Sequence, residues 1–149
     1  MAYTNALSAY RETRVKTASQ GNLVIMLYDE AIKQLDYCLE LLPLHKNGEK
    51  KDPANIEKMG KAIVKTQDVI TELMVSLDFE KGQDIAKNLF GLYNWFNQEL
   101  LESNISKDTR RIVTVRNMLN ELRSAWHEII AKNAAEDAGN PVSGVNIAG

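Results

Sequence analysis

Apolar residues recur at the spacing of an α-helix along most of the 149-residue chain, and short breaks divide them into four long segments. Short loops between long helices place consecutive helices side by side in opposite directions. The sequence therefore predicts an all-α fold, an antiparallel four-helix bundle over residues 19–132. A short N-terminal arm or cap precedes it over residues 1–18. A flexible tail follows over residues 133–149, where glycine and proline interrupt the periodicity.

The breaks between the segments contain residues that commonly begin or end helices. Asp52 followed by Pro53 favours the start of the second helix, because proline at the first helical position loses no needed amide bond. Gly82 interrupts the pattern before the third helix, whose apolar stripe begins near Ile85. Asp108 or Thr109 can cap the fourth helix, which we expect to end near Lys132.

The first helix has more apolar surface than an ordinary bundle helix. Its apolar residues fill an arc of roughly 200°, whereas about 100° is enough to cover a core. Such a helix either lies deep inside the bundle or offers part of its apolar face to another molecule. The helical wheel does not separate these roles for Leu23, Leu27 or Tyr28.

Composition is typical of a folded soluble protein, with 44% hydrophobic and 26% charged residues. A net charge of −2 gives no reason to expect nucleic acid or an acidic membrane surface as a partner. The single cysteine, Cys38, excludes an intramolecular disulfide and fits a core position in a reducing compartment. No apolar run approaches the ~18 residues of a membrane span, and the first residues do not resemble a secretory signal. We therefore expect a cytoplasmic protein.

The sequence offers little for catalysis or metal binding. A di-iron bundle needs Glu-x-x-His on two helices, but Leu42 and Ser124 stand three positions before His45 and His127. There is no glycine-rich phosphate loop and no paired-cysteine motif. The arginines of the fourth helix are spread around its wheel, which does not favour DNA binding. We expect no enzymatic activity, no metal and no cofactor.

The remaining candidate for function is apolar surface. Trp95 lies opposite the apolar face of the third helix, either as a solitary exposed aromatic or as part of a contact site. Leu7, Tyr10 and Val15 interrupt a polar N-terminal segment. They either cover a groove reversibly, as a lid, or complete the core as an ordinary N-terminal turn. A covered groove fits a module that binds an amphipathic helix.

Several short motifs follow one another in a specific order. They are Tyr10 with Val15 five positions later, "TAS" at 17–19, "MLYD" at 26–29, "ELMVSLDFEKGQDIAKNLFGLYNW", "ESNISKD" and "ELRSAW". Their order and spacing, over about residues 8–131, resemble the FliS family of flagellin export chaperones. The chain departs from that pattern at Gln20 and Gly21, where family members commonly have a proline after Thr-Ala-Ser. The tail after Lys132 matches no family motif.

The resemblance implies a cytoplasmic chaperone that needs neither ATP nor metal. Such a protein binds the C-terminal amphipathic segment of flagellin, prevents premature polymerisation and delivers the subunit to the flagellar type III export apparatus. The implied partners are that segment of flagellin and components of the export gate, and we expect a monomer or a weak homodimer. The alternative is a helical regulatory module that sequesters a different protein partner.

The expected partner-binding residues come from the first and third helices. We predict Leu23, Leu27, Tyr28, Asn88, Leu89, Tyr93 and Phe96 as this site, with Leu7, Tyr10 and Val15 as its lid. Asn88 is included because the family resemblance places an asparagine before the leucine there. The apolar members fit the core as well as they fit a groove.

Overall fold

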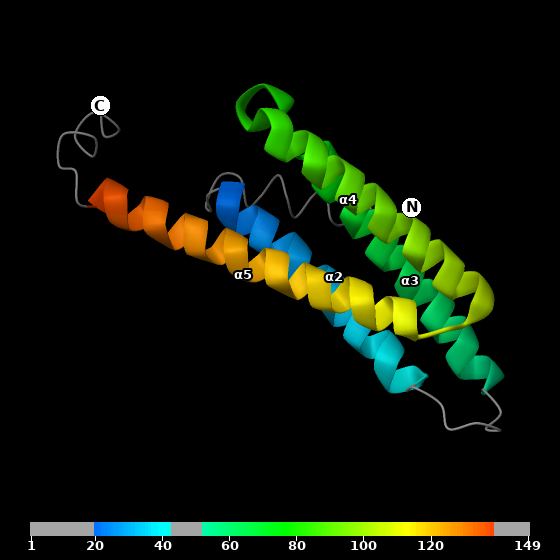
Figure 1. The fold of residues 1–149 in the computed structure, drawn as a ribbon. Coiled ribbons are helices and arrows are strands. Elements are labelled where there is room, and N and C mark those ends of the chain that lie inside the picture. Colours follow the sequence, from blue (N-terminus) through cyan, green and yellow to red (C-terminus); the bar gives the residue numbers. More distant parts are fainter. Residues whose placement is uncertain (1–19, 43–51, 139–149) are drawn as a thin grey trace.

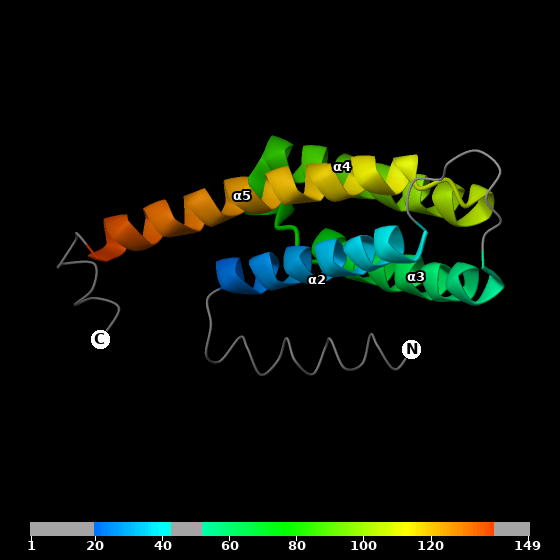
Figure 2. The ribbon, with the colours of Figure 1, turned by 90° about the horizontal axis from the view of Figure 1, so that it is seen from below.

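The computed structural model describes residues 20–42 and 52–138. These residues form α2 (Gln20–Leu41), α3 (Pro53–Val75), α4 (Phe79–Ser106) and α5 (Arg110–Ala138), and the described ranges contain no strand. Successive helices run in opposite directions (Figure 1), and Figure 2 shows α2 and α3 in one layer and α4 and α5 in the other. The predicted all-α four-helix bundle is confirmed. The lid residues Leu7, Tyr10 and Val15, the loop with His45, and residues 139–149 lie outside the described ranges.

Each helix packs against two neighbours, so the bundle closes as α2–α3–α4–α5 around one core. All four helices contribute fully buried apolar side chains, among them Leu35, Ile63, Phe96 and Val115. The wide apolar arc of α2 follows from its position, since α2 packs extensively against both α3 and α5. A helix covered on two sides needs an apolar face wider than a single-sided stripe.

An aspartate stands before each of the three helices that begin within the described residues 52–138. Asp52, Asp78 and Asp108 each accept a hydrogen bond from the backbone amide two positions later, at 2.9, 3.0 and 2.9 Å. These bonds satisfy amides that have no partner inside the helix. The predicted starts at Asp52 and Asp108 are therefore confirmed, whereas the capping role of Asp78 was not predicted.

Two helix boundaries differ from the prediction. Because Asp78 caps an additional turn, α4 begins at Phe79 rather than after Gly82. The break expected near Gly82 is a kink inside α4, where Gln83 has φ 44° and ψ −118°. A positive φ is uncommon for a residue other than glycine, and here it changes the direction of the chain.

The fourth predicted helix is longer than expected, since α5 continues past Lys132 to Ala138. Its apolar periodicity ends near Ile130, which is why the pattern indicated an earlier stop. The following sequence, "AKNAAEDA", is rich in alanine, the residue with the highest helix propensity, and it extends the helix without a core to cover.

The two ends of the bundle are packed differently. We call the end where residues 107–109 join α4 to α5 the turn end. There the Ser103 hydroxyl donates to the Asp108 carbonyl at 2.5 Å, and Lys107 adopts the left-handed conformation that ends α4. From this turn α4 and α5 separate toward the opposite end (Figure 1). On α5, Leu119 is the last fully buried residue among the described side chains.

Candidate protein-binding surface

The structure places most of the predicted partner-binding residues in the core. Leu23, Leu27 and Tyr28 on α2 and Tyr93 and Phe96 on α4 retain between 0% and 4% of their surface exposed. These five side chains therefore contribute to packing in this state, and their contact with a partner stays a prediction.

The other two predicted residues lie further out on α4. Leu89 is half-buried against the core, and Asn88 is exposed. Both residues lie toward the side of α4 that faces α5.

Buried polar groups connect three helices beneath this side of the bundle. The hydroxyls of Tyr28 and Tyr93 share a hydrogen bond between α2 and α4, and their ring centroids are 6.4 Å apart. From α5, Nε1 of Trp126 donates to the Tyr28 hydroxyl oxygen at 3.1 Å. Burial raises the pKa of both tyrosines from the ordinary value, because it disfavours the charged phenolate.

Trp126 was predicted as a residue of the apolar stripe, without a role in a site. The sequence signal for this role of Trp126 was the chemistry of its side chain and not the helical spacing of apolar residues. A buried tryptophan or tyrosine usually finds a hydrogen-bond partner for its polar atom, so three such residues on core-facing stripes could have been expected to meet.

The facing sides of α4 and α5 can be located from an ion pair near the turn end, between Arg111 on α5 and Glu99 on α4. Residues on the same side of α4 precede Glu99 by whole helical turns, and residues on the same side of α5 follow Arg111 by whole helical turns. We call their apolar members the α4–α5 seam. On α4 they are Ile85, Leu89, Leu92 and Trp95, and on α5 they are Met118, Leu122, Trp126 and Ile129.

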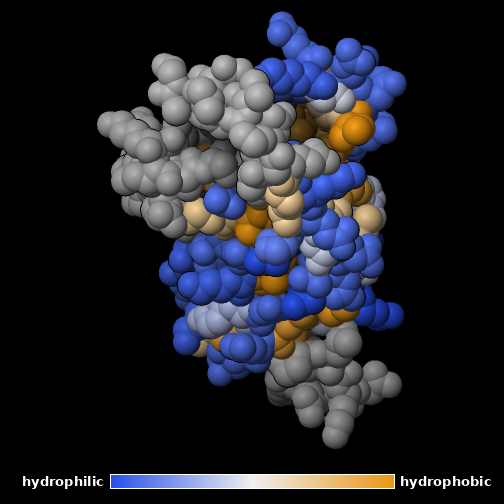
Figure 3. All heavy atoms as spheres, turned by 90° about the vertical axis from the view of Figure 1, so that its left-hand side faces the viewer, coloured by the Kyte–Doolittle hydropathy of each residue, from blue (hydrophilic) through white to orange (hydrophobic). Residues whose placement is uncertain are grey.

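The apolar side chains of the seam are incompletely covered. Six of them are half-buried against the core, while Ile85 and Ile129, at its outer end, are 69% and 49% exposed. Seen from the side where α5 ends, the surface has hydrophobic residues between hydrophilic ones (Figure 3). Neighbouring apolar side chains that stay partly exposed and are bordered by polar residues can form a protein-binding site.

Trp95 belongs to the seam and is not a solitary exposed side chain. It is half-buried, and its ring centroid lies 5.8 Å from that of Phe96 in the core. The exposed Asn88 lies one helical repeat before Trp95, at seven positions, and so on the same side of α4. Asn88 therefore provides a polar group at the edge of an apolar surface.

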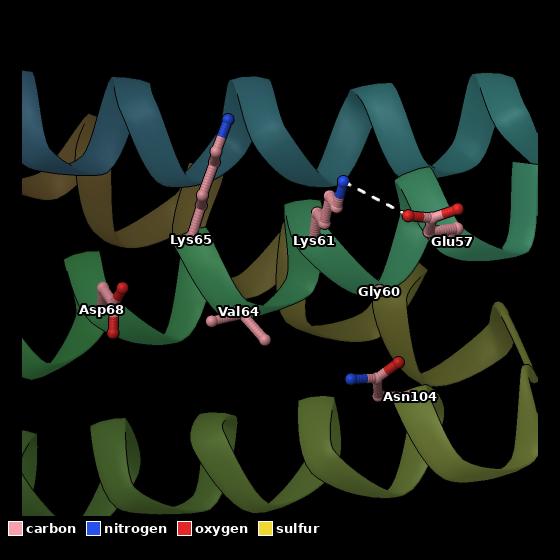
Figure 4. Close-up of a pocket in the computed structure, with 7 residues that line it drawn as sticks. All are labelled: Glu57, Gly60, Lys61, Val64, Lys65, Asp68 and Asn104. Carbon is pink, nitrogen blue, oxygen red and sulfur yellow. Dashed lines mark ion pairs between the residues drawn. The ribbon is translucent and has the colours of Figure 1, made fainter. Parts of the chain in front are cut away.

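A surface depression lies over α3 and α4, on another side of the bundle from the seam. This open hollow of about 500 Å³ is lined by Glu57, Gly60, Lys61, Val64, Lys65, Asp68 and Asn104. Val64 and Asn104 lie between the two helices, whereas Lys61 and Lys65 point to the opposite side of α3, where Lys61 pairs with Glu57 at 3.3 Å (Figure 4). Its charged groups do not converge on one point, so it lacks the arrangement of a small-molecule site.

The arginines of α5 hold that helix against its neighbours. Arg116 donates to Asp36 on α2 at 2.8 Å, and Arg123 forms an ion pair with Asp29, also on α2. Arg111 pairs with Glu99 on α4, as described above. Arg110 pairs with Asp108 in the preceding turn at 3.4 Å, so all four arginines considered for DNA binding have partners within the chain.

The start of α2 makes an unusually close approach to α5. A Cβ atom at Gly21 would lie 2.6 Å from Cγ1 of Ile130, closer than side-chain atoms pack. Glycine at this position therefore lets α5 lie directly against the first turn of α2. The departure from the family motif at Gly21 has a structural role.

No helix in the described parts of the chain has the long apolar run that crossing a membrane requires.

Comparison with known proteins identifies the family. Residues 3–133 match the family model described as "Flagellar protein FliS". The chain is 26% identical over 140 residues to the flagellar secretion chaperone FliS of Bacillus subtilis, covering 94% of this chain and 97% of that protein. It is 30% identical over 128 residues to the protein of the same name from Salmonella typhimurium, covering 85% and 88%. The chain belongs to the FliS family of flagellar proteins.

Proposed function

We propose that this protein is a cytoplasmic chaperone that binds the C-terminal amphipathic segment of flagellin and delivers the subunit to the flagellar export apparatus. Its relatives are named flagellar secretion chaperones, and the resemblance noted in the sequence extends that role to flagellin. A filament subunit carries an apolar face that packs only after assembly. Covering that face before export prevents early association.

The observation that supports this proposal is the incompletely covered α4–α5 seam. An amphipathic helix presents apolar residues at positions i, i+3, i+4 and i+7, and such a stripe fits between two apolar helix faces. The seam offers apolar side chains from both helices, with Ile85 and Ile129 exposed at its outer end. Binding there buries apolar surface on both partners and requires neither nucleotide nor metal.

The proposal assigns different roles to the residues predicted from the sequence. Leu89 and Asn88 are proposed to contact the client directly, with Asn88 hydrogen-bonding a polar group of the client. Tyr28, Tyr93 and Phe96 form the base beneath the seam, since they are buried. Leu92, Leu122 and Trp126 join the contact residues, although the sequence did not single them out.

The partner is tested by calorimetry with full-length flagellin and with flagellin lacking its last ~50 residues, which is roughly 75 Å of helix at ~1.5 Å per residue. We expect an equimolar complex with the full-length protein and a strongly negative heat-capacity change, because the client folds and buries apolar surface. The truncated flagellin should not bind. Undiminished binding of the truncated protein contradicts the proposal and supports a regulatory module with another partner.

The location of the site is tested by a matched pair of substitutions on α4. Ile85 lies on the seam and Ile105 lies near the turn end, and both are 69% exposed. Ile85→Asp should weaken flagellin binding by on the order of tenfold or more, because it places a charge on the apolar contact surface. Ile105→Asp should leave the affinity nearly unchanged. Equal effects of the two variants would place the binding site elsewhere.

A further inference from the structure

Away from the turn end, polar contacts hold α4 against α3 and the later part of α5 against α2, while α2 and α3 stay packed against each other. Beyond Leu119, α5 is attached to α2 by the Arg123–Asp29 ion pair and by the close approach of Ile130 to Gly21. The hydrogen bond from Trp126 to Tyr28 also joins α5 to α2.

On the other side of the seam, α4 is attached to α3. The Gln67 side chain donates to the Asn97 carbonyl at 3.1 Å, and the Asn97 side chain donates to the Thr71 hydroxyl at 3.5 Å. Polar contacts thus bind α4 to α3 and the later part of α5 to α2. Nearer the turn end the Arg111–Glu99 ion pair joins α5 to α4, and the hydrogen bond between Tyr28 and Tyr93 links α2 to α4 across the core.

This link is unusual in its chemistry for a bundle core. Two phenylalanines fill nearly the same volume as Tyr28 and Tyr93 without bringing hydroxyls out of water. The hydroxyls are tolerated because they bond to each other and to the Trp126 indole. When the helices separate, water or a client backbone can replace these bonds. Water cannot replace the apolar contacts around the two hydroxyls in the same way. Breaking the hydrogen bonds therefore costs less free energy than exposing the same area of apolar surface, and a contact made by hydroxyls can open and close more readily.

We propose that the Tyr28–Tyr93 hydrogen bond is a clasp that holds the α4–α5 seam closed in the free protein and breaks when the client's apolar stripe enters. This inference rests on the proposed function. A closed seam keeps six of its eight apolar side chains half-buried, which limits association with other proteins. The affinity for the client then equals the intrinsic affinity of the open form multiplied by the open fraction.

The clasp itself can be tested without a client, by amide hydrogen exchange of Tyr93→Phe. This variant keeps the ring and removes one hydroxyl, and Tyr37→Phe is the matched control because Tyr37 is an exposed tyrosine of α2. Exchange in residues 84–93 and 120–130 should become about three- to tenfold faster in Tyr93→Phe, because the closed form loses about one hydrogen bond. Unchanged exchange, or the same acceleration throughout the bundle, overturns the clasp.

Flagellin binding gives a second readout. Tyr93→Phe should bind full-length flagellin about three- to tenfold more tightly than the wild type, because a larger fraction is open. Tyr28→Phe removes this bond together with the one from Trp126 and should also bind more tightly, while Tyr37→Phe should not differ from the wild type. Weaker or unchanged binding by both clasp variants contradicts the clasp.

The two hypotheses fail in different ways. Failure of the wild-type protein to bind flagellin contradicts the proposed function, whatever the exchange experiment shows. Normal binding by the wild type, with unchanged affinity in the clasp variants, contradicts the clasp alone.

Discussion

The turn end and the seam differ although the same α4 and α5 helices form both. At the turn end, Leu100 and Ile112 are completely buried, and three residues connect the helices that carry them. Toward the seam the same helices separate, and their apolar side chains are half-buried or exposed. The short connection joins α4 and α5 to each other at the turn end, whereas at the other end residues 76–78 join α4 to α3 and α5 packs on the start of α2. The comparison suggests that stability resides mainly at the turn end and binding at the seam.

The largest expected difference comes from the same substitution at each end of α4. Leu100→Ala should lower the free energy of unfolding by about 2–5 kcal/mol, because a fully buried leucine leaves a cavity. Leu92→Ala removes a half-buried side chain and should cost about 1 kcal/mol or less, because its site is already partly hydrated. Urea denaturation measures both values.

Flagellin binding should show the opposite order. Leu92→Ala should weaken binding, and Leu100→Ala should bind normally at temperatures where it stays folded. A loss of stability in Leu92→Ala as large as that in Leu100→Ala would mean that the seam is ordinary core, and the comparison would fail.

The helices could be predicted from the sequence because periodicity and capping residues act within one segment. Asp52 and Asp108 mark helix starts by local hydrogen bonds alone. The kink at Gln83 was only partly predicted, since Gly82 indicated a break but not a helical turn before it.

The surface required information that a helical wheel does not contain. The wheel treats each helix by itself, so it could not show that Tyr28 meets Tyr93 of α4 and Trp126 of α5, or that Leu92 is only half-buried. Whether an apolar residue is core or surface depends on the angle between neighbouring helices, and that angle is set by contacts distant in sequence. The bond between Trp126 and Tyr28 joins residues 98 positions apart.

An intermediate effect is expected where α5 lies on the start of α2. Gly21→Ala places a methyl group 2.6 Å from Cγ1 of Ile130, so the Ile130 side chain or the helix must move. Overpacking of this kind costs about 1–3 kcal/mol, and the lower chain entropy of alanine offsets part of it. We expect a net loss of about 1–2 kcal/mol in thermal or urea unfolding, with faster amide exchange in residues 120–130.

A second substitution serves as the control for this contact. Ile130→Ala removes the atoms that meet the new methyl group, so the double variant Gly21→Ala/Ile130→Ala should recover most of the loss caused by Gly21→Ala. If the two changes are simply additive, the close approach does not hold α5 in place.

The smallest expected effect tests whether water reaches the buried side chains at the turn end. Cys38 is completely buried, and burial raises the pKa of its thiol from 9.0 to about 12. Between these values the unfolded chain loses the thiol proton while the folded protein keeps it, so stability falls as pH rises. At pH 10 the free energy of unfolding of the wild type should be about 1 kcal/mol lower than at pH 7, beyond any decrease in Cys38→Ala.

Tyr28 and Tyr93 are present in both proteins, so their contribution cancels in the comparison. Urea denaturation of both proteins at pH 7, 9 and 10 measures the difference. Parallel pH dependence of the two would mean that water reaches Cys38, and that the turn end is no drier than the seam.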